Sequence, residues 1–135
     1  MQADDIKALS KLRMEHAFEC LETAGQIMAL GDYKGAANRS YYAVFHAMRA
    51  VLAFDMIDKK KHSGVISEFR RLYVKTGIFS REMSDIISNL FDIRTGSDYD
   101  DFFIIAKDDV EKQVADAGTF IENVKNYLDK KAEEH

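Results

Sequence analysis

The sequence contains no proline and a single cysteine among its 135 residues, and both features narrow the fold. Without proline, helices can run unbroken, and seven glycines alone do not support a turn-rich all-β fold. Cys20 cannot form an intramolecular disulfide, which is typical of a reducing compartment, so we expect a cytoplasmic protein. No secretory signal peptide is evident. The longest run of large aliphatic and aromatic residues, 102–105, is far too short to span a bilayer. We therefore expect no membrane association.

The net charge of -4 argues against a protein whose whole surface binds nucleic acid. Basic residues nevertheless gather between positions 59 and 81, where Glu68 is the single acid. A solvated face is the usual explanation of such a run. Contact with RNA or with an acidic protein is the alternative. The basic residues are Lys59, Lys60, Lys61, Arg70, Arg71, Lys75 and Arg81.

Apolar residues spaced three and four apart predict an all-α fold, an up-and-down bundle of about five helices. The length fits one domain over residues 1–135, with 130–135 as a frayed tail. The first helix is predicted over about 4–30 and the second to about 57. We expect Gly31 to end the first helix and Gly77 to end the third. The expected N-terminal caps of the second to fifth helices are Asp32, Ser63, Ser80 and Asp108.

The apolar stripe of the fourth helix breaks at Arg94. A guanidinium on an inward face must be paired or must line a groove, because burying it alone is costly. Asp98 and Tyr99 follow on the last turn or just beyond it. An ion pair between Arg94 and Asp98 at the helix end is one interpretation. A functional groove is the other.

The second helix carries a polar strip beside its apolar stripe. Arg39, Tyr42, His46 and Arg49 are spaced three, four and three apart, so they share one face. Arginines can pack their stems while their charged ends stay in water. Packing or an interface explains the strip by itself. If this helix faces the fourth, Arg39, Tyr42 and Arg49 become candidate substrate-binding residues beside Arg94.

Several segments resemble a known family. The resemblance covers nearly the whole chain, and it is carried by the combination of three segments. These are Asn38-Arg39-Ser40-Tyr41-Tyr42-Ala43-Val44-Phe45-His46-Ala47, Lys61-His62-Ser63-Gly64-Val65-Ile66, and Leu90-Phe91-Asp92-Ile93-Arg94 continuing through Ser97-Asp98-Tyr99. The chain resembles the HEPN domains, in particular the small stand-alone HEPN proteins related to toxins that pair with minimal nucleotidyltransferases.

This resemblance implies a five-helix bundle that forms a homodimer. Many members are metal-independent ribonucleases or toxins, often with a small nucleotidyltransferase as antitoxin. Their motif is an arginine and, after four to six residues, a histidine. Arg94 matches that arginine and would contact the phosphate of RNA. Residues 102–105 belong to no clear helix face, and we expect them at the dimer contact.

The chain departs from the motif at the histidine, whose place is taken by Tyr99. A phenol with a pKa near 10 is a poor general base at neutral pH. Asp98, Asp100 and Asp101 also add negative charge where RNA would approach. His46, on the strip with Arg39, is an alternative source of an imidazole. The sequence thus favours a module that binds RNA, a nucleotide or a nucleotidyltransferase; an active endoribonuclease that works as a homodimer is the alternative.

Two other helical classes fit less well. A ferritin-like di-metal bundle needs Glu-x-x-His pairs. None exists here, because Arg13, Ala43 and Lys59 stand three residues before His16, His46 and His62. A helix-turn-helix DNA reader around residues 76–80 would present a reading helix rich in acids. We expect neither a metal nor a cofactor.

Overall fold

The computed structural model describes residues 3–99 and 105–134 of the chain, and most of these residues are helical. Within these ranges, the side chains of residues 3, 94, 95 and 97–99 are not described. The elements are α1 (Ala3–Ala29), α2 (Tyr33–Phe54), α3 (His62–Phe69), a π-helix (Arg70–Val74), α4 (Arg81–Tyr99) and α5 (Lys107–Glu134). The described residues therefore form the predicted all-α bundle.

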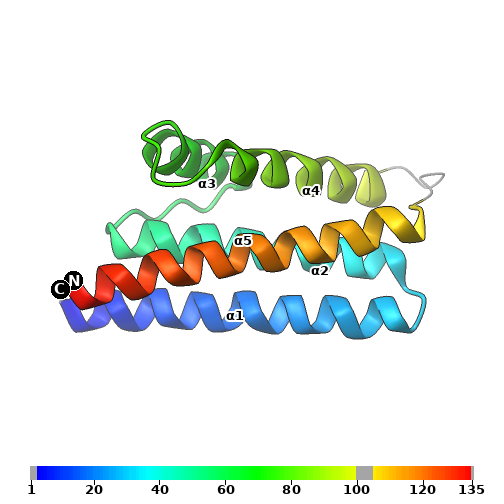
Figure 1. The fold of residues 1–135 in the computed structure, drawn as a ribbon, viewed down its shortest axis with the longest axis horizontal. Helices are drawn as coiled ribbons and strands as arrows, with labels where there is room; N and C mark the ends of the chain where they lie inside the picture. Colours follow the sequence, from blue (N-terminus) through cyan, green and yellow to red (C-terminus); the bar gives the residue numbers. More distant parts are fainter. Residues whose placement is uncertain (1–2, 100–104, 135) are drawn as a thin grey trace.

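The long helices run up and down, each antiparallel to the one before it (Figure 1). α2 is central, because it packs against α1, α3, α4 and α5. α1 lies below it in Figure 1, and α3 and α4 form a layer above it. The first and last helices bring the two ends of the chain side by side. Between α1 and the layer of α3 and α4, one face of α2 is therefore left uncovered by a neighbouring helix of the described residues.

Four of the predicted helix boundaries match the structure closely. α1 ends before Gly31, which adopts a φ of +88° that glycine tolerates without strain. The carboxylate of Asp32 then caps α2, since Oδ1 accepts a 2.8 Å hydrogen bond from Gly35 N. Gly77 also has a positive φ, +84°, and ends the third helical segment as predicted. α4 begins directly after Ser80.

Three other boundary predictions are wrong. α3 begins at His62, and the residue at its cap is Lys61, which makes no side-chain cap hydrogen bond. α5 begins at Lys107, so Asp108 lies inside its first turn. A carboxylate there still stabilises the helix, because it interacts favourably with the helix dipole. The helix continues to Glu134, so it includes residues 130–134, and the frayed tail stays a prediction. The second helix is also shorter than predicted, ending at Phe54.

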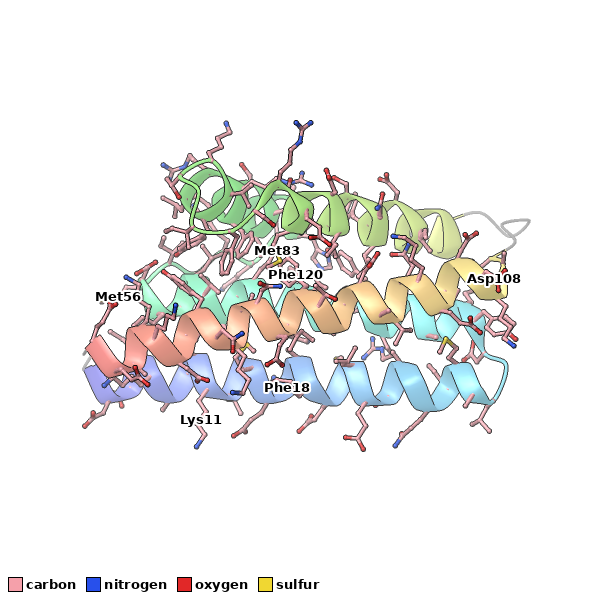
Figure 2. The ribbon with its side chains drawn as sticks, in the orientation of Figure 1. Lys11, Phe18, Met56, Met83, Asp108 and Phe120 are labelled. Atoms are coloured by element: carbon pink, nitrogen blue, oxygen red, sulfur yellow. The ribbon has the colours of Figure 1, made fainter. Side chains whose placement is uncertain are left out.

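The core follows the predicted apolar stripes. Tyr41, Met48 and Leu52 of α2 are each at most 1% exposed, and so are Ile87 and Leu90 of α4. Figure 2 shows the side chains of Met83 and Phe120 between α4 and α5, and both are buried. Lys11 points away from the bundle in the same view. Burial of these stripes against α2 is the main force that holds the helices together.

The third helical segment contains a π-helical turn that the sequence did not predict. Lys75 N donates to Arg70 O at 2.9 Å, a hydrogen bond between residues five apart. Phe69, directly before this turn, and Tyr73, within it, are buried against Phe79. These rings therefore pack where the helix widens. The wider turn also changes the direction of the basic side chains in this segment.

Candidate functional site

The four polar residues predicted on α2 do share one exposed face. Arg39, Tyr42, His46 and Arg49 are all partly exposed, while the residues between them are mostly buried. We call this set the α2 strip. α1 borders the strip on one side, and His62 at the start of α3 borders it on the other. The helical spacing seen in the sequence thus becomes a continuous surface.

Arg39 is held by neutral partners. Its Nη2 donates to Asn38 Oδ1 at 2.8 Å, and its Nη1 lies 4.0 Å from the sulfur of Cys20 on α1. The guanidinium also sits 5.0 Å from the centre of the Tyr42 ring, a distance typical of a cation–π contact. Within the described residues, no carboxylate pairs with Arg39. Its positive charge is oriented and remains available to a ligand.

Arg49 shares one carboxylate with an arginine of α1. Arg49 Nη2 lies 3.0 Å from Asp58 Oδ1, and Arg13 Nη2 lies 3.4 Å from the same atom. Arg13 Nη1 also donates to the backbone oxygen of Arg49 at 3.1 Å. The hydrogen bond from Arg49 and the two positive charges lower the pKa of Asp58. Two guanidinium groups therefore share one negative charge, and this end of the strip keeps a net positive charge.

His46 lies between these arginines and touches His16 of α1 edge to face, with ring centres 5.6 Å apart. Burial, followed by the charges of His16, Arg49 and Arg39, lowers the pKa of His46 to about 4. The imidazole is therefore neutral at pH 7. In that state it can accept a hydrogen bond or a proton, but it cannot act as an acid.

His62 is a site residue that the sequence reasoning missed. The Tyr41 hydroxyl and His62 Nδ1 are 2.7 Å apart and share a hydrogen bond. The imidazole stacks on Phe45 at 4.3 Å and meets the edge of Tyr42 at 5.7 Å. In the sequence, His62 follows the three lysines at 59–61. Helical periodicity gives no signal for its contact with Tyr41, which lies 21 residues away. The tyrosine pair and Phe45 on α2 were the only hint of an aromatic surface.

Arg94, Asp98 and Tyr99 occupy the last turns of α4, but their side chains lie outside the described residues. Phe91, three residues before Arg94, has its ring 5.9 Å from that of Tyr41 on α2. Position 94 is one turn beyond Phe91 on a helix that runs antiparallel to α2. The backbone thus brings position 94 toward the half of α2 that carries Arg39. Of the dimer contact predicted at residues 102–105, residues 102–104 also lie outside the described residues.

Two features of residues 3–99 and 105–134 bear on metal binding and on membranes. No group of three or more histidine, cysteine, aspartate or glutamate side chains there could hold a metal ion. No helix in the same ranges combines the length and the apolar character needed to cross a membrane.

Comparisons with protein-family models and with known proteins agree on one family. Residues 10–127 match the model of the HEPN domain. A protein of Methanocaldococcus jannaschii named "Putative toxin" is 31% identical over 122 residues, which cover 90% of this chain and 82% of that protein. A second "Putative toxin" of the same organism is 29% identical, with 92% of each chain covered. A "UPF0332 protein" of Thermotoga maritima is 29% identical over 84% of this chain and 86% of its own.

The chain therefore belongs to the HEPN domain family, and its bundle is the structure expected of that class.

Proposed function

We propose that this HEPN domain is a toxin-like module that binds RNA. Its contact surface would be the α2 strip together with the last turns of α4, which carry Arg94, Asp98 and Tyr99. The two relatives named as toxins support a toxin-like role. We further propose that the domain works as a homodimer with a minimal nucleotidyltransferase as its partner.

The observation that carries the proposal is the arrangement of charge on the strip. Arg39 has no carboxylate partner within the described residues, and Arg13 and Arg49 share only Asp58. Guanidinium groups suit phosphates because they donate several hydrogen bonds in a plane. A row of such groups on one face supplies the salt-dependent attraction that dominates nucleic-acid binding.

The aromatic rings of the strip suit the bases of a single strand. Tyr42 is partly exposed, and its ring lies 5.0 Å from the guanidinium of Arg39 and 5.7 Å from the ring of His62. Bases in single-stranded RNA stack on aromatic side chains at about 1–3 kcal/mol each. Arg39 and Tyr42 therefore offer a phosphate contact and a stacking contact next to each other. A free nucleotide could satisfy the same pair, so oligonucleotide length is a variable of the test.

Binding without cleavage is the chemistry that the residues favour. Tyr99 replaces the motif histidine, and the pKa of about 4 makes His46 a weak base. The alternative is a metal-independent endoribonuclease that acts as a homodimer. It is favoured by one observation, a neutral imidazole at His46 beside Arg39 and Arg49. In that case His46 would accept the proton of the attacking hydroxyl while Arg94 contacts the phosphate.

Affinity for a labelled single-stranded RNA, measured across a series of salt concentrations, tests the proposal. Arg39→Ala should weaken binding about tenfold and reduce the salt slope by about one phosphate contact. Lys112→Ala removes an equal charge from the exposed face of α5 and should leave both quantities unchanged. Equal losses of RNA affinity in the two variants would show that binding is non-specific electrostatic attraction and would contradict the proposal.

The same samples separate binding from catalysis. The binding proposal expects intact RNA with the wild-type protein and weaker binding with Arg94→Ala. RNA cleavage that disappears in both Arg94→Ala and His46→Ala would establish the alternative. Cleavage that survives His46→Ala would remove His46 from the chemistry.

A further inference from the structure

A second concave surface lies between α3, the π-helix and α4. It encloses about 570 Å³ and is separate from the α2 strip, none of whose residues line it. Its wall carries three hydroxyls, three basic side chains and an apolar floor. The polar members are Ser63, Ser67, Ser88, Arg70, Arg71 and Lys75. Ile66, Ile87 and Phe91 form the floor, and Asp92 completes the wall.

The π-helical turn gathers the basic side chains into this pocket. Its hydrogen bond joins Lys75 N to Arg70 O, five residues apart, so the turn is wider than in an α-helix. Arg70, Arg71 and Lys75 all line the same pocket as a result. Single π-helical turns occur frequently at functional sites, because they re-aim side chains at a cost in helix stability. Here the turn begins with Arg70 and Arg71, and Lys75 follows its last residue.

Arg70 is fixed in place before any ligand arrives. Its Nε donates to Ser84 Oγ at 2.9 Å, and its Nη2 donates to Ser84 O at 3.0 Å and to Ser88 Oγ at 2.5 Å. These partners are neutral groups of α4, so the charge of the guanidinium is not cancelled. Within the described part of the chain, Nη1 donates to no protein acceptor. An oriented guanidinium with one free edge is a strong anion contact, since little entropy is lost on binding.

The charges of the pocket leave a net positive end. Arg71 pairs with Glu68, with Nη2 2.9 Å from Oε2. Asp92 lies one turn along α4 from Ser88, which also accepts a hydrogen bond from Arg70, and it forms no ion pair with described residues. Lys75 is exposed and forms no ion pair with described residues. Among the described residues, Arg70 and Lys75 pair with no carboxylate, and with Arg71 they outnumber the acids Glu68 and Asp92 at this pocket.

We propose that this pocket binds a small organic phosphomonoester. The phosphate would be held by Arg70 and Lys75 with hydroxyls of the serines, and the body of the ligand would cover Ile66, Ile87 and Phe91. A phosphomonoester carries about two negative charges and three acceptor oxygens at neutral pH, which matches two free cations and several donors. The volume of about 570 Å³ lies in the range of small-molecule sites and has room for a phosphate and a body of at least one ring, and the apolar floor favours such a ligand over the bare ion.

Calorimetric titration with phenyl phosphate, inorganic phosphate and phenol tests the pocket. Phenyl phosphate should bind saturably and more tightly than either fragment, because only it uses both the cations and the floor. Lys75→Ala should weaken that binding about tenfold, the loss of one charge-assisted contact. Lys75 makes no structural ion pair with described residues, so the variant should fold normally.

Two matched variants control for general charge and for the α2 strip. Lys60→Ala removes an exposed cation of the same basic segment that does not line the pocket, and it should leave phenyl phosphate affinity unchanged. Arg39→Ala should also leave it unchanged, even if RNA binding is lost. No saturable binding of phenyl phosphate, or equal losses in Lys75→Ala and Lys60→Ala, would overturn the proposal.

Discussion

The low pKa of His46 makes the stability of this protein depend on pH in a defined window. The imidazole has a folded-state pKa of about 4 against an ordinary value of 6.5, because it is buried among positive charges. Above pH 6.5 the ring is neutral in both states, and folding loses nothing. As the pH falls toward 4, the unfolded chain takes up a proton that the folded protein resists. Stability is therefore lost between about pH 6.5 and 4.

The size of the loss follows from the same values. At about 1.4 kcal/mol per pKa unit, the difference between 6.5 and about 4 sets a ceiling near 3 kcal/mol. Solvent reaches part of the ring, so we expect about 1–2 kcal/mol after screening. Urea unfolding of the wild type and His46→Gln at pH 7 and pH 4.5 isolates this contribution. The wild type should lose more stability than the variant over that interval.

Titration of the histidine signals by nuclear magnetic resonance checks the cause directly. His46 should titrate near 4. His16→Gln removes the second-largest cause and should raise the pKa of His46. A His46 signal that titrates near 6.5 in the wild type would refute the reasoning, whatever the unfolding data show.

Three further substitutions test other parts of the structure. Asp32→Ala removes the 2.8 Å cap bond to Gly35 N and should lower the free energy of unfolding by about 1 kcal/mol, whereas Asp32→Asn should keep most of it. Asp58→Asn should raise RNA affinity a few-fold in a binding assay, because it frees the two arginines, while stability changes by less than about 1 kcal/mol. Phe120→Ala should cost about 3–5 kcal/mol in urea unfolding, since its ring is fully buried.

The parts of the fold that local rules govern could be predicted from the sequence. The stripe of Tyr41, Met48 and Leu52 faces the core because helical periodicity fixes which residues share a side. Gly31 and Asp32 mark a helix boundary because one needs a positive φ and the other offers a cap acceptor. Both features depend on neighbours within four residues, and both are confirmed.

The parts that depend on distant contacts could not be predicted. α3 begins at His62 rather than after Ser63, and the ring of His62 packs on Phe45 and shares a hydrogen bond with Tyr41. The π-helical turn packs Tyr73 against Phe79, a ring that follows the next turn of the chain. For the α2 strip, spacing predicted the shared face. The partners from α1 that set the charge and pKa of His46 came only from the fold.

The central claim is that RNA contacts the exposed face of α2, and a map of backbone amide signals during titration with single-stranded RNA tests it most directly. We predict that the largest changes fall on Arg39, Tyr42, His46 and Arg49, with smaller ones on the adjoining part of α1. Changes concentrated on the outer face of α5, or none at all with RNA in excess, would contradict it.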